Sequence, residues 1–297
     1  MKKILKKTTD SAVVGIVTAM LIVSLIVTVI SIFQLVYVPI IMEQREAEHM
    51  DRVAEQFGFL TSVIDDQAAV QNKGIPIATF VTLGSKELPF LISSKASGTL
   101  EVLEKSSIIT ITNESINNNI QTSVFPIGKI TYSSANAYFL DQSYTYEAGA
   151  MIVSQSKGNL MMVQPGFFVD YNETTNTVNI SFNVVNISGA EQKNIAAGSG
   201  VCAIQTKFNE ISMIKNFTKV SSITINTPYS NAWYVFINRS LMNARLNYAG
   251  YGTQFYLNET QGESVKIDFK FSILLDQVNI NFKIIDIQAQ IGPGWVE

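Results

Sequence analysis

The side chains that could perform chemistry are few, and they lie far apart in the sequence. The 297-residue chain holds a single cysteine, Cys202, and a single histidine, His49. Cys202 lies within the apolar, strand-like run Gly200-Val201-Cys202-Ala203-Ile204, which is typical of a buried and inert thiol. His49 stands in an acidic stretch, and we expect it to be a solvated surface residue. A single thiol, with His49 as the only histidine that could act as its base, offers little for catalysis near neutral pH.

Metal and carboxylate chemistry is equally poorly supported. Zinc sites use several Cys or His ligands, and one cysteine also excludes an intramolecular disulfide. The adjacent acids Asp65 and Asp66 could bind a cation, but paired acids at a helix end are usually solvated. We recognise no glycine-rich phosphate loop and no nucleophile elbow. The sequence therefore predicts no catalytic residue, no cofactor and no metal site, and we expect that the protein is not an enzyme.

The composition favours a membrane-associated chain over a nucleic-acid-binding one. Charged residues make up 15% and hydrophobic residues 47% of the chain, and its net charge is -3. Soluble domains usually carry roughly 25% charged residues. No basic stripe with interleaved aromatic residues is present in the sequence, so we expect no nucleic-acid partner.

The N-terminal segment predicts one membrane-spanning helix. The stretch from Ala12 to Met42 holds no Asp, Glu, Lys or Arg. It is about 31 residues long, whereas about 20 suffice to cross a bilayer. A secretory signal peptide would have an apolar core of only about 7–15 residues, followed by a small-residue cleavage site. Four lysines precede the stretch and several acids follow it, which places the N-terminus in the cytoplasm and the remainder outside. The lysines are Lys2, Lys3, Lys6 and Lys7.

The helical pattern continues beyond the membrane as an amphipathic stalk. Apolar residues recur at steps of three and four, which buries one face of a helix against another surface. They are Met50, Val53, Phe57, Leu60 and Ile64. Arg45, Glu46, Glu48, Arg52 and Glu55 are assigned to the opposite, polar face. The stripe could pack on the chain's own β domain or on neighbouring subunits. A helix from near Ser11 to near Val70 would be about 90 Å long, with a kink at Pro39.

Beyond Lys73-Gly74-Ile75-Pro76, which ends the helical pattern, the chain reads as β-rich. Short runs of Ile, Val, Thr, Phe and Tyr alternate with polar residues, clearly over 99–103, 177–184 and 277–287. Roughly a dozen strands predict a sandwich or a pair of packed sheets. A boundary near Pro165-Gly166 favours two β subdomains over one continuous sheet system. We expect the aromatic run 233–236 to lie in the core.

The predicted outer region contains seven Asn-x-Ser/Thr acceptor patterns. They begin at Asn113, Asn172, Asn179, Asn186, Asn216, Asn238 and Asn258. Such patterns mark candidate N-glycosylation sites in exported proteins. We expect that at least a few carry sugar, which would shield the sheets and oppose pairing at their edges.

Three short segments resemble a poorly characterised family of archaeal type IV pilin-like surface proteins. The first is Lys6-Lys7-Thr8-Thr9-Asp10-Ser11-Ala12-Val13-Val14-Gly15-Ile16, a basic leader before a small-residue helix start. The others are Tyr132-Ser133-Ser134-Ala135-Asn136-Ala137-Tyr138 and Tyr146-Glu147-Ala148-Gly149-Ala150-Met151-Ile152-Val153. The resemblance covers about the first 170 residues. It implies an N-terminal helix, a β-rich ectodomain, and helices that pack together as a filament core.

The resemblance fails at the expected processing site. A prepilin peptidase usually cleaves after a basic residue followed by Gly or Ala, whereas this chain reads Lys7-Thr8-Thr9-Asp10-Ser11 there. Within the apolar stretch, Ser24, Thr28 and Ser31 lie at steps of four and three and would let helices approach and hydrogen-bond. The alternative is a tilted lone span with incidental hydroxyls. Filament assembly and permanent tethering therefore both remain open.

The sequence as a whole predicts a mainly β protein with one long N-terminal α-helix. Residues 1–10 form a basic cytoplasmic leader, 11–42 the transmembrane helix, 43–72 an amphipathic stalk, 73–165 a first β subdomain and 166–297 a second. We expect a single-pass cell-surface protein whose partners are membrane lipid and other pilin-like subunits. The leading hypothesis is a filament subunit or minor pilin presenting its β-rich domain for assembly or adhesion. The alternative is a membrane-tethered extracellular binding module that does not polymerise.

Overall fold

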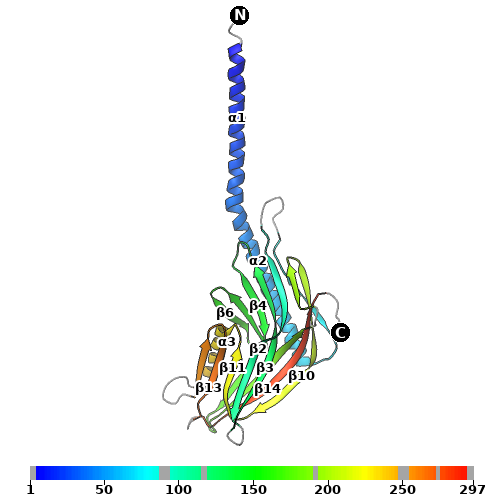
Figure 1. Ribbon diagram of the computed structural model, residues 1–297, viewed down its shortest axis with the longest axis vertical. Helices are drawn as coiled ribbons and strands as arrows, with labels where there is room; N and C mark the ends of the chain where they lie inside the picture. Colours follow the sequence, from blue (N-terminus) through cyan, green and yellow to red (C-terminus); the bar gives the residue numbers. More distant parts are fainter. Residues whose placement is uncertain are drawn as a thin grey trace.

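A computed structural model describes the backbone of residues 5–86, 94–114, 119–189, 193–246, 254–271 and 275–292, and side chains from residue 13 onward. The protein is mainly β, with one long N-terminal helix that projects from a β-rich body (Figure 1). This is the fold class that the sequence predicted.

The N-terminal helix is continuous through three segments. Helix α1 (Leu5–Ile32) leads into a π-helical turn (Phe33–Tyr37) and then into α2 (Val38–Val70). The N–H of Val38 bonds to the carbonyl of Phe33, so the ladder widens immediately before Pro39, which has no N–H to contribute. The helix bends at this turn (Figure 1). α2 ends where Gln71 adopts a left-handed conformation, with φ of 57°.

Two sheets form the body. The five-stranded sheet has the order β1-β10-β14-β8-β7, and the nine-stranded sheet has the order β12-β13-β11-β2-β3-β4-β5-β6, with β9 paired to β2. The strands of the first sheet are β1 (Ile77–Thr82), β7 (Gly166–Asn172), β8 (Thr177–Gly189), β10 (Val201–Phe217) and β14 (Gln277–Ile291). Those of the second are β2 (Ser97–Glu114), β3 (Ile120–Ala135), β4 (Gln142–Glu147), β5 (Ala150–Gln155), β6 (Gly158–Val163), β9 (Ile195–Gly198), β11 (Val220–Asn226), β12 (Phe255–Thr260) and β13 (Ser264–Phe269).

The sequence boundary predicted near Pro165-Gly166 does not divide the body. β1 precedes this point and pairs with β10, which follows it. In the other sheet, β2 precedes it and pairs with β11. Both sheets therefore take strands from both sides of the predicted boundary. The separation into residues 73–165 and 166–297 is corrected to one interleaved pair of sheets.

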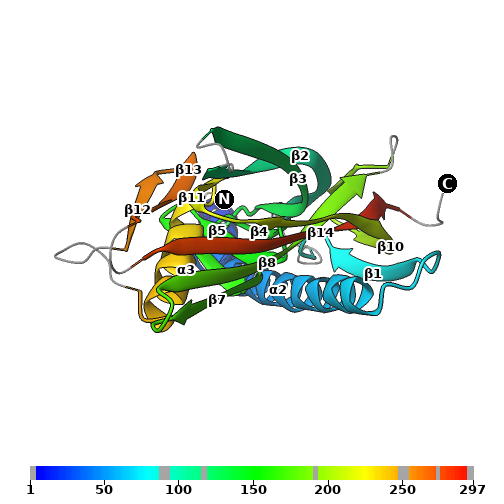
Figure 2. The same ribbon diagram turned by 90° about the horizontal axis from the view of Figure 1, so that it is seen from below.

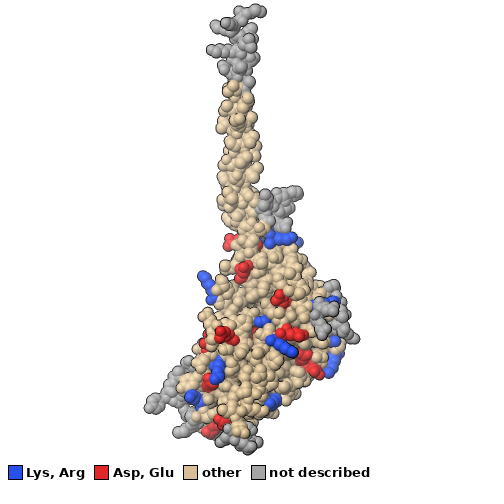
Figure 3. All heavy atoms as spheres, viewed as in Figure 1, with Lys and Arg blue, Asp and Glu red and all other residues tan. Residues whose placement is uncertain are grey.

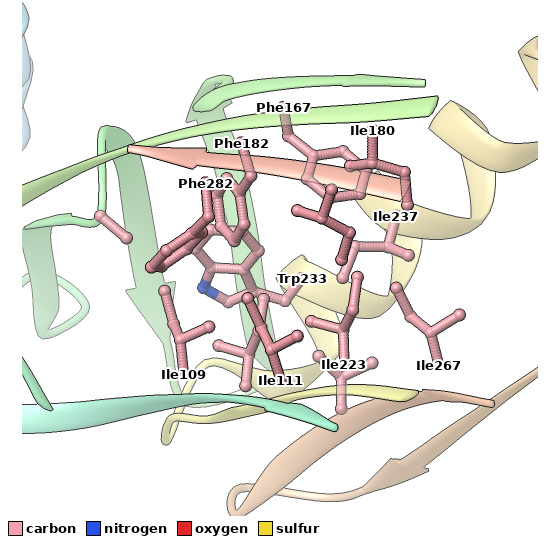
Figure 4. Close-up of a cluster of buried hydrophobic side chains, with 14 of the residues drawn as sticks. Ile109, Ile111, Phe167, Ile180, Phe182, Ile223, Trp233, Ile237, Ile267 and Phe282 are labelled. Atoms are coloured by element: carbon pink, nitrogen blue, oxygen red, sulfur yellow. The ribbon is translucent and has the colours of Figure 1, made fainter. Parts of the chain in front are cut away.

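Alternation along the strands builds two core clusters between the sheets. In the cluster farther from α1, Phe182 and Phe282 of the five-stranded sheet pack toward Ile109 and Ile223 of the other sheet (Figure 4). In the cluster nearer α1, side chains of both sheets pack against α2, which lies along the body (Figure 2).

One helix interrupts the predicted run of strands. Helix α3 (Ser230–Asn243) closes the first cluster, with Trp233 and Ile237 fully buried and Phe236 6% exposed. The core position expected for Trp233 and Phe236 is confirmed, whereas Val235 is exposed. The expectation of β structure here was wrong, because the spacing of Trp233, Phe236, Ile237 and Leu241 has the period of a helix.

Candidate functional site

The first half of the N-terminal helix exposes apolar side chains on all of its sides. Met20, Leu21, Leu25 and Ile30 are 61–66% exposed, although they point in different directions around the helix. No charged side chain interrupts the described stretch from Val13 to Met42 (Figure 3). This helix is long and apolar enough to cross a membrane. So large an apolar surface must be covered by lipid or by other apolar helices.

The second half of the helix is fixed to the chain's own β domain. Phe57, Leu60 and Ile64 are fully buried and belong to the cluster that includes strands of both sheets. The Phe57 ring lies 6.5 Å from that of Tyr132 and 6.0 Å from that of Tyr144, measured between ring centres. The sequence left open whether the apolar stripe packs on the chain's own β domain or on neighbouring subunits. In the structure it packs on the chain's own sheets.

The carboxylate of Glu46 anchors the start of the docked half. Its side chain is fully buried and accepts hydrogen bonds from the backbone N–H groups of Ala137 (3.1 Å), Tyr138 (2.7 Å) and Phe139 (2.7 Å). A carboxylate that receives several N–H groups is a strong, charge-assisted acceptor. The assignment of Glu46 to the solvated polar face is therefore corrected, since it lies on the buried stripe.

His49 lies on the same buried stripe, three residues further on. It is 3% exposed, and its Nε2 lies 3.0 Å from the carbonyl oxygen of Thr82 in β1. The expectation of a solvated histidine was wrong. Burial lowers the pKa of the imidazole below its usual 6.5, which outweighs the opposing effects of the Thr82 carbonyl and Glu46. Gln56 also holds Thr82, because its Oε1 accepts the Thr82 N–H at 2.8 Å.

Further polar contacts extend this attachment toward the end of α2. The Tyr146 hydroxyl donates to Asp65 at 3.1 Å, and Gln67 Nε2 donates to the carbonyl of Thr206 at 2.8 Å. Desolvation raises the pKa of Asp65, while the bond from Tyr146 opposes that shift. Asp66 is exposed. Asp65 therefore helps to hold the helix to β4, and no group of three metal-ligating side chains forms among the described residues.

Cys202 occupies β10 in the half-buried margin of the core that faces α2. Its thiol lies 3.5 Å from the carbonyl of Ala203, and burial raises its pKa. A raised pKa keeps the thiol protonated and poorly nucleophilic. His49, the only histidine, is committed to Thr82. The structure thus assigns packing and anchoring contacts to both residues.

The three helix-packing candidates all lie on the exposed half of the helix. Ser24 Oγ donates to the Leu21 carbonyl at 2.9 Å, and Thr28 Oγ1 donates to the Ser24 carbonyl at 2.8 Å. Ser31 is exposed. Hydroxyls bonded within their own helix need no outside partner, so they tolerate both lipid and a neighbouring helix.

The seven glycosylation candidates occupy very different environments. Asn172, Asn179, Asn216 and Asn258 are exposed, and Asn238 is half-buried on α3. Asn113 is 9% exposed and donates to the Thr218 carbonyl. Asn186 uses both ends of its amide, donating to Asp286 and accepting from the Gly128 N–H. The exposed group offers the most accessible acceptors, and modification of any of the seven stays a prediction.

A buried polar network that sequence reasoning missed fastens α3 to the sheets. Glu147 is 1% exposed and accepts hydrogen bonds from Ser107 Oγ, Thr227 Oγ1 and the Trp233 indole N–H. Lys129 lies directly opposite it across β3 and β4, with Nζ 3.9 Å from its carboxylate. In the sequence, only Trp233 could have indicated this network, because the N–H of a buried indole requires a hydrogen-bond acceptor. These contacts join α3 to β2, β3 and β4 through buried side chains, so the network serves packing.

The described geometry defines a class of protein in which one apolar helix projects from a β-rich domain and is built into that domain over its second half. The chain belongs to a family of unknown function, DUF7289, whose model matches residues 10–254. No curated protein matches the chain.

Proposed function

We propose that the protein is a pilin-like subunit of the cell surface, whose apolar helices pack together while the β domain faces outward. The observation that carries this proposal is the division of one continuous helix into two halves. The first half is exposed on all sides and the second is embedded in the domain. Apolar surface of this extent is unstable in water, so the free half needs a lipid or helical environment.

Because the second half of the helix is attached at several points, the helix and the β domain form one rigid unit. Three N–H groups hold Glu46, Thr82 holds His49 and Gln56, and Tyr146 holds Asp65. A helix fixed in this way sets the direction in which its domain projects. Packing of identical helices would then arrange identical domains regularly around the outside, as closed or helical symmetry requires.

The charge distribution supports a cytoplasmic N-terminus. Lys2, Lys3, Lys6 and Lys7 precede the apolar stretch, and acids dominate immediately after it. The β domain, with its glycosylation candidates, would then lie outside the cell. The resemblance to archaeal pilin-like proteins adds to this reading, and Ser24, Thr28 and Ser31 are the residues we propose for contacts between helices.

A permanently tethered extracellular binding module is the second candidate, and two observations at the expected processing site favour it. The segment Lys7–Ser11 offers no Gly or Ala at the position expected for cleavage. Its backbone is also helical, because α1 begins at Leu5. Proteases act on extended substrates, so a helix here protects the leader. In that case the apolar helix stays in the bilayer as a lone span.

Peptide mapping of the mature N-terminus separates the two functions. Protein from the native host is recovered separately from membranes and from material sheared off the surface. A pilin-like subunit should appear in the sheared fraction with its N-terminus between Thr8 and Ala12. An intact leader found only in membranes would refute the filament proposal and support the tethered module.

A matched pair of double variants sharpens this experiment. Replacing Lys6 and Lys7 by glutamine removes the basic residues beside the processing site, whereas replacing Lys2 and Lys3 removes the same charge further away. A processed subunit should lose its sheared material in the first variant only. Equal behaviour of both variants would contradict processing at this site.

A further inference from the structure

The outer face of the five-stranded sheet forms an amide-rich platform at the end of the body away from α1. β14 and β8 lie side by side there, with β7 beyond them (Figure 2). A shallow hollow of about 510 Å³ lies over these strands and the end of β10. That volume is within the range of about 300–1,000 Å³ that small ligands occupy.

Strand register places four outward-facing side chains in one straight row. Asn216 of β10 pairs with Asn281 of β14, Asn281 pairs with Ser181 of β8, and Ser181 pairs with Phe168 of β7. Three strand spacings make the row roughly 14 Å long, which suits an oligosaccharide of about three units. Phe168 closes the row and is 68% exposed, so its ring face is available for contact.

A second row beside the first is ordered by its own hydrogen bonds. Gln277 Nε2 donates to Asn279 Oδ1 at 2.7 Å, and Asn279 Nδ2 donates to Asn179 Oδ1 at 3.1 Å. Asp170 of β7 pairs with Asn179 and ends this row. Linked amides hold their orientation before a ligand arrives, which reduces the entropy lost on binding.

We infer that this platform binds a neutral oligosaccharide. Each sugar hydroxyl both donates and accepts hydrogen bonds, and a primary amide offers both functions in one planar group. An exposed aromatic ring packs against the C–H face of a sugar. Among the described residues, no Lys or Arg lines the hollow, so the platform lacks the cation cluster that nucleic acid needs.

The outward face of the other sheet carries charged groups beside an amide, since Asn258 of β12 pairs with Lys266 of β13. Around β11 and β13 its outward positions carry Thr224, Lys266 and Asp268, and the last two form an ion pair at 2.8 Å. The oligosaccharide proposal goes beyond filament assembly and does not depend on it, because binding is a property of the platform in a single chain.

The test uses the full chain in lipid nanodiscs, so that no sugar-based detergent competes. An array of neutral glycans, followed by titration with maltotriose, mannotriose and triacetylchitotriose, should identify a bound oligosaccharide. Phe168→Ala and Asn281→Ala should each weaken binding by about tenfold. Phe168→Tyr should retain binding, because it keeps the ring. Phe80→Ala is the matched control, since Phe80 is 59% exposed on β1 of the same sheet but outside the platform.

Three results would overturn the inference. The first is an array on which no neutral glycan binds the protein, and the second is equal binding by the Phe168→Ala and Phe80→Ala variants, each shown to be folded by circular dichroism. The third is a glycan attached to Asn179 or Asn216 in protein from the native host, because the chain's own sugar would then cover the platform.

Discussion

Replacing Glu46 by alanine should release the beginning of α2 from the β domain. The change removes the acceptor of three backbone hydrogen bonds and leaves the N–H groups of Ala137, Tyr138 and Phe139 to find water. Hydrogen bonds to a charged group contribute about 1.5–3 kcal/mol each, but the three share one carboxylate and their donors lie in a partly exposed loop. We therefore expect a loss of about 2–4 kcal/mol in the free energy of unfolding, well below the sum of the three.

Glu48→Ala is the control for this experiment. Glu48 lies on the exposed side of the same helix turn, where it accepts a hydrogen bond from Gln44 at 3.0 Å. Its replacement should change stability by less than about 0.5 kcal/mol. Urea unfolding measures the global effect in nanodiscs, and hydrogen exchange of amides 137–139 measures the local one. Equal stability of the two variants, with unchanged exchange at those amides, would refute an anchoring role for Glu46.

Three further predictions test the core and the buried histidine. Phe57→Ala should lower the free energy of unfolding, measured in urea, by about 3–5 kcal/mol. Phe59→Ala, at a side chain that is 61% exposed, should be close to neutral. Similar losses for the two variants would contradict the docking of α2. Gly128→Ala should destabilise the protein by about 1–3 kcal/mol, because the new Cβ would lie 2.0 Å from a backbone oxygen of β8. In Gly58→Ala the new Cβ meets no atom within 4 Å, so this change should stabilise α2 by about 0.5–1 kcal/mol. Because burial lowers the pKa of His49, the unfolded chain binds the proton more readily, so stability should be full above pH 6.5 and fall as the pH drops below it. His49→Gln should remove this part of the pH dependence, and an unchanged fall would assign it to other groups.

The helix and its end could be predicted from the sequence, but the roles of its polar residues could not be read from residue type. The apolar stripe defined the buried face, and Glu46 and His49 lie on it by spacing, four and seven residues after Met42. Their charge and polarity argued for solvent. The N–H groups that receive Glu46 belong to a loop about ninety residues away, and no local pattern announces such a partner.

The β-rich character of the body was also predictable, whereas its sheet order was not. Alternation identifies a strand and its buried face, as along 177–184, but it does not choose the neighbour. The long register between β8 and β14, which joins Gln277 to Thr177, is a parallel pairing across about a hundred residues. α3 was missed for a different reason. Its Trp, Tyr, Val and Phe residues favour strands by type, and packing of its helical face overrode that preference.

The position of β14 also governs when the β domain can fold. β14, the last of the described strands, lies in the interior of its sheet between β10 and β8 and contributes to both core clusters. Until residues 277–291 have been synthesised, β10 and β8 each present one unpaired edge. The apolar stripe of α2 also lacks the β14 side chains against which it packs. Contacts so distant in sequence form slowly, and those of β14 cannot form before residues 277–291 have been synthesised. A chain cut short before residue 277 would leave these strand edges exposed and would be prone to aggregate.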